Sequence, residues 1–334
     1  MKTINLAVWG LGRHALVRIL PAINSINQIN LIGICSRNKK LVLDIASAQK
    51  CVGWTNSTEM FTEDSIDVIY IATPIGVHFE QAAAAIEAGK NVWCEKPLTC
   101  SYEESKKLVS LAKKSNKMLA EAFMFLYHPQ FEKLQGYIKN KSQGQVHSLT
   151  LKFGIPPLEN PGFRLNHSLG GGAFWDIASY PFSAVLSLFE YQEVKILFSE
   201  IIKRNDSLVD TDGLALLRFS NGTLAYLEWG MNLSYRNEID VWSENGSLFM
   251  DKVFSKPENY QTQFKYRDLK GEENIESGEI SNQFINMLKA FYETYFSSVK
   301  ISKEYQFILN RAKLLDEILS NSNSNSNSNS KSKE

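Results

Sequence analysis

The sequence predicts an α/β protein of two domains, an N-terminal domain with a parallel sheet and a C-terminal α+β domain with an open, mainly antiparallel sheet. Its 334 residues suffice for about two domains of roughly 150 residues each. Up to residue 122, short apolar runs alternate with helical patterns, which is typical of parallel strands covered by helices on both faces. From residue 123 to 320, longer runs joined by tight turns favour antiparallel pairing. Residues 321–334 form a separate tail.

The composition is typical of a soluble globular protein. Hydrophobic residues make up 44% and charged residues 22%, which excludes wholesale disorder and a disulfide-rich scaffold. The 36 basic and 36 acidic side chains cancel, so we expect neither nucleic acid nor an anionic membrane as a partner. The start shows no secretory signal, and no run is long enough to span a membrane. The four cysteines form no CxxC pair, so we expect reduced thiols, a cytoplasmic location and no metal site.

The N-terminal elements follow from apolar runs and helical spacing. Continuously apolar runs, as in buried parallel strands, predict strands at residues 5–9, 29–35, 68–72, 91–94 and 118–122. Apolar residues at helical spacing predict helices at residues 13–23, 39–48, 77–88 and 102–115. Gly89 follows the third of these helices, as glycine often does at a helix C-terminus.

Two hairpins define the C-terminal domain. Strands 213–219 and 223–229 flank one Asn-Gly pair and strands 238–242 and 247–250 flank another, because Asn-Gly supplies the positive φ angles of a tight turn. Both faces of strand 213–219 are apolar. A sheet that is apolar on both faces needs two covers, so we expect helices on one side and a second subunit on the other, in a homodimer or homotetramer.

Helical patterns return at residues 281–296 and 305–319. Five Asn-Ser repeats follow, from Asn321 to Ser330, and lead to the charged end of the chain. This tail contains no apolar residue that could be buried. We therefore expect residues 321–334 to be disordered.

A glycine-rich turn follows the first predicted strand. The segment Gly10-Leu11-Gly12-Arg13-His14-Ala15 fits the G-x-G-x-x-A form of the dinucleotide-binding fingerprint and opens a predicted helix. The first glycine permits the tight turn, the second lets the backbone approach a pyrophosphate, and the small third residue allows close packing of helix and strand. The sequence therefore predicts a nucleotide site here.

The end of the second predicted strand bears on the choice of cofactor. An acidic residue there binds the ribose 2′-hydroxyl of NAD, whereas an arginine accommodates the 2′-phosphate of NADP. Here Ser36 and Arg37 follow the strand, and no carboxylate does. We therefore expect NADP(H) to be preferred. NAD(H) is the alternative if the basic residues 37–40 are only the solvated start of a helix.

Polar residues stand at the ends of two further predicted strands. Thr73 and Pro74 follow one strand, and Glu95 and Lys96 end the other. Ligands bind outside the carboxyl ends of parallel strands, so we expect these four residues to lie along the cofactor.

In the C-terminal domain, three glycines precede a helical pattern that carries Asp176 and Tyr180. The spacing i, i+4 places this carboxylate and this phenol on one face of a helix.

Together these motifs resemble the glucose–fructose oxidoreductase, inositol dehydrogenase and rhizopine-catabolism (Gfo/Idh/MocA) family. The glycine turn, Glu95-Lys96-Pro97 and the Gly-Gly-Gly-Ala-x-x-Asp block follow one another in the family order. Many members have histidine four residues after that aspartate. This chain has Tyr180, similar to glucose–fructose oxidoreductase, dihydrodiol dehydrogenases and nucleotide-sugar 3-ketoreductases. Residues 123–130 and Phe163-Arg164 resemble the ketoreductase branch most closely.

The resemblance implies an N-terminal Rossmann domain, a C-terminal domain for substrate binding and oligomerisation, and a set of catalytic residues. Ketone reduction needs a hydride donor at the carbonyl carbon and a proton for its oxygen. We expect Lys96 to polarise the carbonyl, Tyr180 to donate the proton and Asp176 to orient Lys96 or a substrate hydroxyl. The Lys96-Pro97 bond is expected to be cis. From the residues alone, Tyr180 can also be a core tyrosine, and Asp176 an acceptor on the side of a helix.

Further residues are expected to contact the ligands. The cofactor set is Gly10, Leu11, Gly12, Arg13, His14, Ser36, Arg37, Thr73, Pro74, His78, Glu95, Lys96 and Trp175. The substrate set is His128, Arg164, Asp176 and Tyr180. Arg164 is a candidate for a substrate phosphate or hydroxyl, with a surface ion pair as the alternative.

The function implied is that of an NADP-dependent oxidoreductase that reduces a keto group of a nucleotide-linked hexose. The same Lys/Tyr pair also suits a free-sugar or dihydrodiol dehydrogenase working in the oxidative direction. A regulator that binds the cofactor without turnover is a third alternative, because a fold does not fix a function. An intact proton donor weighs against it.

Overall fold

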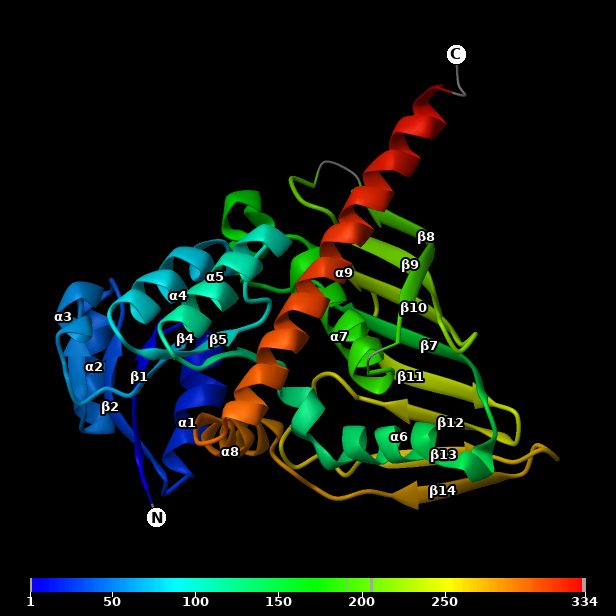
Figure 1. The fold of residues 1–334 in the computed structure, drawn as a ribbon, viewed down its shortest axis with the longest axis horizontal. Coiled ribbons are helices and arrows are strands. Elements are labelled where there is room, and N and C mark those ends of the chain that lie inside the picture. The colour runs from blue at the N-terminus through cyan, green and yellow to red at the C-terminus, as the bar shows by residue number, and fades with distance from the viewer. Residues whose placement is uncertain (1, 191, 205–206, 332–334) are drawn as a thin grey trace. The chain divides into compact units, whose positions relative to one another are not determined.

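A computed structural model describes residues 2–190, 192–204 and 207–331, and the chain forms two compact units (Figure 1). The first unit comprises Met1–Met124 and Phe284–Ala312, and the second comprises Phe125–Gln283 and Lys313–Glu334. The first division of the chain lies close to the predicted boundary. The sequence does not predict the return of residues 284–312 to the first unit, because helical spacing shows that a helix has a buried face but not which sheet it covers.

The first unit contains a six-stranded sheet in which all neighbouring strands are parallel. Its order is β3-β2-β1-β4-β5-β6, which confirms the predicted parallel sheet. The strands are β1 (Ile4–Trp9), β2 (Ile29–Cys35), β3 (Val52–Trp54), β4 (Val68–Ile71), β5 (Asn91–Glu95) and β6 (Leu119–Ala122). The sequence misses β3, because three residues are too few to establish a pattern.

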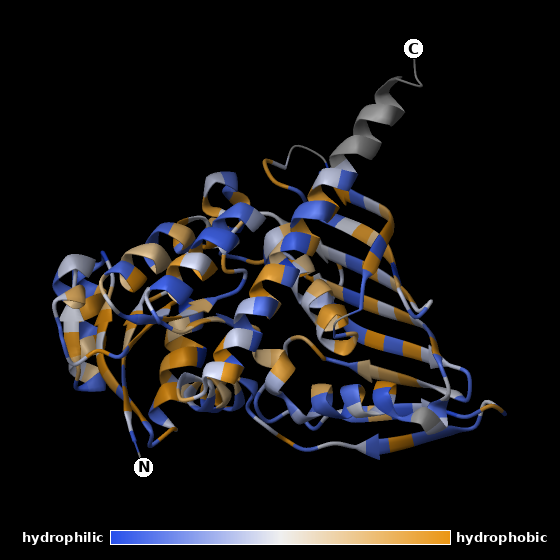
Figure 2. Ribbon diagram, in the orientation of Figure 1, coloured by the Kyte–Doolittle hydropathy of each residue, from blue (hydrophilic) through white to orange (hydrophobic). Residues whose placement is uncertain are grey.

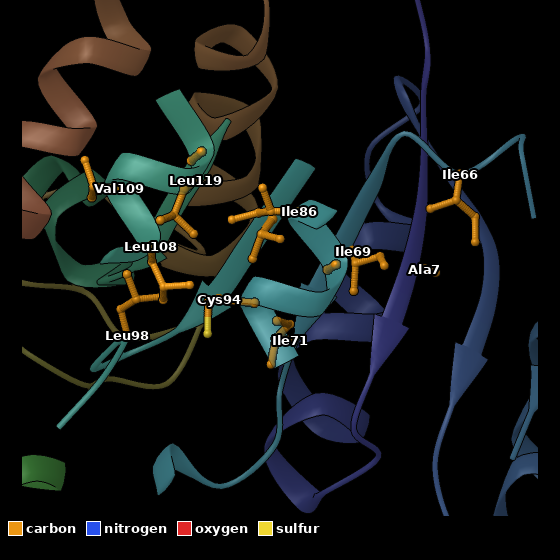
Figure 3. Close-up of a cluster of buried hydrophobic side chains, with 14 of the residues drawn as sticks. Ala7, Ile66, Ile69, Ile71, Ile86, Cys94, Leu98, Leu108, Val109 and Leu119 are labelled. Atoms are coloured by element: carbon orange, nitrogen blue, oxygen red, sulfur yellow. The ribbon is translucent and has the colours of Figure 1, made fainter. Parts of the chain in front are cut away.

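Helices cover both faces of this sheet. They are a turn of π-helix (Ala15–Ile19) that leads into α1 (Leu20–Asn24), then α2 (Lys39–Gln49), α3 (Ser57–Phe61), α4 (His78–Glu87), α5 (Tyr102–Lys114), α8 (Gln283–Tyr295) and the first part of α9 (Ser298–Lys331). On one face, Ile71 of β4 packs in a core cluster with Ile86 of α4 and Leu108 of α5 (Figure 3). On the other face, Trp93 of β5 packs against Phe291 of α8, with ring centroids 5.4 Å apart.

The second unit contains an eight-stranded open sheet of order β14-β13-β12-β11-β7-β10-β9-β8. Its neighbours are antiparallel except for β7 with β10, which confirms the mainly antiparallel prediction. The strands are β7 (Val146–Ile155), β8 (Val194–Ile202), β9 (Asp212–Phe219), β10 (Leu224–Met231), β11 (Arg236–Ser243), β12 (Gly246–Asp251), β13 (Gln263–Arg267) and β14 (Glu273–Ser277). Hydrophobic and hydrophilic residues alternate along several of them (Figure 2).

Helices α6 (Pro129–Lys139) and α7 (Ser179–Leu188) lie over one face of this sheet (Figure 1). Leu217 of β9 faces this layer and is fully buried, whereas its neighbour Leu216 points to the opposite face and is only half-buried. The expected helical cover on one face is therefore present, and the described residues leave the other face partly exposed.

Helix α9 continues through the Asn-Ser segment to Lys331, which differs from the expected disorder of that segment. Residues 332–334 of the predicted tail lie outside the described part of the chain. The start of the extension has a physical reason, because the Ser199 hydroxyl of β8 lies 3.1 Å from Asn321 Oδ1 and 3.1 Å from Ser322 Oγ. An established helix then extends at low cost per residue.

The helices also bear on whether the chain can insert into a membrane. Across residues 2–190, 192–204 and 207–331, none of them combines the length and the apolar composition that a membrane crossing requires.

Candidate active site

The glycine-rich turn begins the site of the first unit. Gly10 has a φ of +111° and donates its N–H to Cys35 O at 2.9 Å. A Cβ on Gly10 would lie 2.6 Å from Ala72 O, so only glycine fits where three strands end together. Gly12 differs, because a Cβ there would meet nothing within 4 Å. The backbone thus leaves open space beside a helix N-terminus, which fits the phosphates of a dinucleotide.

The other residues expected at the cofactor differ in exposure. Exposed side chains belong to Arg13, His14 and Arg37, and half-buried ones to Ser36, Thr73 and Pro74. Leu11 is the exception, because its side chain is buried in the core and only its backbone can face a ligand.

Glu95 joins the glycine turn to the end of β5. Its Oε1 accepts a hydrogen bond from Tyr70 Oη at 2.7 Å and lies 2.9 Å from His14 Nε2. Burial acts to raise the pKa of Glu95, but His14, Tyr70 and Lys96 together hold it below its usual value. Glu95 therefore carries its negative charge beside Lys96 and fixes the side chain of His14.

Lys96 lies in a half-buried position after β5, and the Lys96-Pro97 bond is cis, as the resemblance implies. His78 contacts the backbone of this turn. Its Nδ1 lies 3.0 Å from Pro97 O, and its Nε2 lies 2.8 Å from Thr73 O. The prediction that His78 contacts the cofactor does not agree with the structure, because its side chain is fully buried. Burial also lowers the pKa of His78, against the opposing effect of the two carbonyls.

In the second unit, the three glycines let the chain fold tightly before the helix that carries Tyr180. A Cβ on Gly171 would lie 2.6 Å from Arg164 O, and a Cβ on Gly172 would lie 2.1 Å from Asp210 Oδ1. The Asp210 carboxylate accepts a hydrogen bond from Phe174 N at 2.6 Å and so caps this helix. Burial raises the pKa of Asp210 to about 6, and the N–H bonds act in the opposite direction.

Gly172→Ala is expected to disturb this cap. The new methyl group would displace the Asp210 carboxylate, and φ at position 172 is +119°, so we expect the free energy of unfolding to fall by about 1–3 kcal/mol. Denaturant unfolding measures the change. Gly136→Ala in α6 is the control, because a Cβ there meets nothing within 4 Å. An equal loss of unfolding free energy in both variants would contradict the role of Gly172.

Arg164 and Asp176 form an ion pair. An ion pair was the alternative that the sequence left open for Arg164, but the sequence did not indicate Asp176 as its partner. Arg164 Nε donates to Asp176 Oδ2 at 2.6 Å, and the Asp176 side chain is only 7% exposed. Asp176 lies in a turn of π-helix (Phe174–Ala178), an irregularity that is frequent at functional sites. The pair fixes the carboxylate one turn before Tyr180. It also occupies the Nε–H of Arg164, a residue that was expected to contact the substrate.

Tyr180 is surrounded by aromatic rings. Its ring centroid lies 5.0 Å from Phe153, 5.8 Å from Phe125 and 6.1 Å from Phe254. These contacts restrict the ring to one orientation and therefore aim the hydroxyl. Trp175, expected at the cofactor, is half-buried beside Phe174 with centroids 4.9 Å apart.

The prediction that His128 contacts the substrate does not agree with the structure. His128 is 1% exposed, and its Nδ1 accepts a hydrogen bond from Gln130 N at 3.0 Å as the N-cap of α6. Burial and the positive charge of Lys256 lower the pKa of His128 to about 4, so the imidazole is neutral. Its role is in the fold of the second unit.

A metal site requires several ligating side chains close together. Within the parts of the chain that the structure describes, no group of three or more His, Cys, Asp or Glu side chains could hold a metal ion.

Comparison with known proteins identifies the family. Residues 4–123 match the model of the oxidoreductase family with an NAD-binding Rossmann fold, and residues 131–249 match the GFO/IDH/MocA C-terminal domain. A dTDP-3,4-didehydro-2,6-dideoxy-alpha-D-glucose 3-reductase of Saccharopolyspora spinosa is 30% identical over 78% of this chain and 78% of that protein. The chain belongs to the Gfo/Idh/MocA family. It is an NAD(P)-dependent oxidoreductase, which confirms the resemblance seen in the sequence.

Other Gfo/Idh/MocA proteins match nearly the whole chain. The reductase of the same name from Actinomadura kijaniata is 28% identical over 94% of each chain. The crystal structure of KijD10, a 3-ketoreductase from that organism in complex with NADP and TDP-benzene, has a TM-score of 0.90 and 26% identity, and the match covers 96% of this chain and 98% of KijD10. Further KijD10 structures carry a lysine changed to alanine or a tyrosine changed to phenylalanine.

Proposed function

We propose that this Gfo/Idh/MocA protein reduces a keto group of a nucleotide-linked hexose with NADPH, and that Lys96 and Tyr180 act on the carbonyl oxygen. One observation carries the proposal. The lysine and the tyrosine changed in the KijD10 variants are separated in that chain by as many residues as Lys96 and Tyr180 are here. Relatives named as dTDP-sugar 3-reductases support a nucleotide-linked substrate.

The proposed reaction assigns one task to each side chain. The bound NADPH supplies the hydride that forms the new C–H bond. The Lys96 ammonium donates a hydrogen bond to the carbonyl oxygen and stabilises the negative charge that develops on it. Tyr180 transfers its hydroxyl proton to the same oxygen, which becomes the product hydroxyl, and then regains a proton from water. Asp176, whose position is fixed by Arg164, is proposed to accept a hydrogen bond from a neighbouring substrate hydroxyl.

The rate of NADPH oxidation tests the substrate class. We expect turnover with a dTDP-linked 3-keto-6-deoxyhexose and little turnover with the same sugar lacking the nucleotide. A free-sugar dehydrogenase is the second candidate, because a D-xylose 1-dehydrogenase (NADP(+)) of Haloferax volcanii is 27% identical over 71% of the chain. Reduction of NADP⁺ by free aldoses, with no response to nucleotide-linked ketosugars, would favour that candidate.

The preference for NADPH is proposed to depend on Arg37. This side chain is exposed directly after β2, and KijD10 binds NADP. Arg37→Ala is expected to raise KM for NADPH about tenfold, the effect of losing one charge-assisted hydrogen bond, and to leave KM for NADH unchanged. Steady-state kinetics with both cofactors measure this. Lys50→Ala is the control, because it removes a charge at the other end of α2 and should change neither KM. If Arg37→Ala weakens NADPH and NADH binding equally, the proposed role of Arg37 in the choice of cofactor is contradicted.

We also propose that two copies associate through the open face of the eight-stranded sheet. Phe198, Leu216 and Tyr226 lie side by side across β8, β9 and β10 on the face opposite the helices. Phe198 is 41% exposed in the single chain, and Trp242 on the same sheet is 61% exposed. A row of apolar side chains on an open sheet is typical of a surface that a partner covers.

Light scattering of the purified protein tests this association. The wild type is expected to be a dimer or tetramer, and Leu216→Glu to be a monomer, because the interface would bury an unpaired carboxylate. Leu269→Glu is the control, since Leu269 is exposed in the turn between β13 and β14. A monomeric wild type would overturn this proposal.

A further inference from the structure

The backbone that follows Lys96 in the chain makes a second buried contact. Leu98 lies two residues after Lys96, and its N–H donates to Glu121 Oε1 of β6 at 2.8 Å. Together with the His78 bond to Pro97 O, this contact fixes the Pro97–Leu98 peptide group at both its C=O and its N–H. Leu98 and Glu121 are both buried, so water does not satisfy these groups.

Helix α9 holds Glu121 in turn. The second carboxylate oxygen, Glu121 Oε2, accepts hydrogen bonds from Arg311 Nε at 2.9 Å and from its NH2 group at 2.6 Å. Both side chains are only 4% exposed, and the guanidinium lies 4.3 Å from the centre of the Phe123 ring. Two N–H groups of Arg311 therefore converge on one oxygen of Glu121, and Oε1 is left for the Leu98 N–H.

A second carboxyl of the same helix completes the group. Glu304 Oε1 accepts a hydrogen bond from Glu121 N at 3.2 Å. Burial raises the pKa of Glu304 to about 7, although Arg311 acts in the opposite direction. The raised pKa means that the negative charge of Glu304 is disfavoured beside Glu121, whose own charge is paired with Arg311.

A buried ion pair gives little net stability, because the cost of desolvating two charges offsets their attraction. Such a pair does fix geometry, since its two partners have few alternative positions. The atom that Glu121 fixes is a backbone N–H in the turn that carries Lys96. The Glu121–Arg311 pair therefore acts on the position of the backbone beside Lys96.

We propose that Glu121 is a positioning residue for Lys96, and that Arg311 on the C-terminal helix fixes Glu121 for this purpose. The inference rests on the proposed catalytic role of Lys96. The C-terminal segment that returns to the first unit thereby becomes part of the catalytic apparatus without touching substrate.

Two double variants isolate the hydrogen bond to Leu98. Glu121→Gln with Arg311→Met removes both charges but keeps an amide oxygen for the N–H. Glu121→Leu with Arg311→Met removes the charges and the acceptor. Replacing both partners of a buried pair avoids an unpaired buried charge, so both proteins are expected to fold. Thermal unfolding and NADPH titration, expected to be equal for the two, establish the comparison.

The turnover numbers then decide the proposal. We expect kcat of the glutamine variant to be close to the wild type and kcat of the leucine variant to be at least about tenfold lower, because a misplaced catalytic group loses rate steeply. KM for NADPH should be unchanged in both. Equal kcat values in the two double variants would overturn the proposal. Lys313→Met, which breaks an exposed pair on the same helix, is the control and should leave kcat unchanged.

A single variant and a combination complete the test. Glu121→Asp keeps the charge beside Arg311 but is too short to reach Leu98, so it should lower kcat as the leucine variant does. Adding Lys96→Met to both double variants should abolish the difference between them. If Lys96→Met alone leaves the wild-type rate unchanged, the proposed function fails; if Lys96→Met is inactive but the double variants are equal, only the positioning role fails.

Discussion

Lys96→Met is expected to lower kcat by a factor of about 10²–10³ or more while the protein still binds NADPH. Methionine matches the length of the lysine side chain but carries no charge and no N–H donor. The negative charge that develops on the carbonyl oxygen would then lose its cation, whereas the glycine turn and the end of β2 would be unchanged. Steady-state kinetics and a fluorescence titration with NADPH separate the two effects.

Lys90→Met provides the control for this variant. Lys90 is a buried lysine of the same unit, and its Nζ donates to Glu63 O at 2.8 Å. We expect that change to affect stability and to leave kcat within the range of the wild type. A Lys96→Met protein with near-normal turnover would contradict the assignment of Lys96, because no other effect of the substitution could compensate for the lost charge.

Tyr180→Phe is expected to have the second largest effect, a loss of about 10²–10⁴ in kcat. Phenylalanine preserves the ring contacts with Phe125, Phe153 and Phe254, so the fold of the second unit should be retained. The substitution removes only the hydroxyl and therefore the proton for the alkoxide oxygen. The measurement is kcat in H₂O and D₂O, because a slow proton transfer from another donor would increase the solvent isotope effect.

Tyr226→Phe serves as the matched control. Tyr226 lies on the open face of the sheet, where its hydroxyl donates to Glu228 Oε1 at 3.0 Å. Loss of this hydroxyl should leave kcat unchanged. If Tyr180→Phe and Tyr226→Phe both turn over like the wild type, Tyr180 is only a core residue and the proton comes from another group.

Much of the first unit could be predicted from the sequence because its strands are continuously apolar and its helices have regular spacing. Glu95 and Lys96 were predicted at the site for the same reason, since they end such a run where ligands bind. The sequence gives no signal for Arg164 with Asp176 or for Glu121 with Arg311. In each pair the partners are brought together by folding, and nothing in their local spacing indicates contact.

Burial explains the two histidines that were assigned to ligands. His78 and His128 lie in segments that resemble the family, but the sequence does not show which side of the backbone a side chain occupies. In the structure each is enclosed and bonded to nearby backbone groups, so each supports a loop or a helix end. The sequence did not single out Asp210, because this residue stands in a loop and contacts the helix that carries Tyr180 only after the glycine run has folded.

The most direct test of the account is to follow the hydride itself. Purified protein is incubated with a dTDP-linked 3-keto-6-deoxyhexose and NADPH that carries deuterium at the transferred position, and the sugar product is examined by mass spectrometry and NMR. We predict that the product gains one deuterium on the former carbonyl carbon, and that Lys96→Met and Tyr180→Phe slow this transfer as steeply as they lower kcat. A product without deuterium, or transfer only to a free sugar, would contradict the central claim that the chain reduces a nucleotide-linked ketosugar.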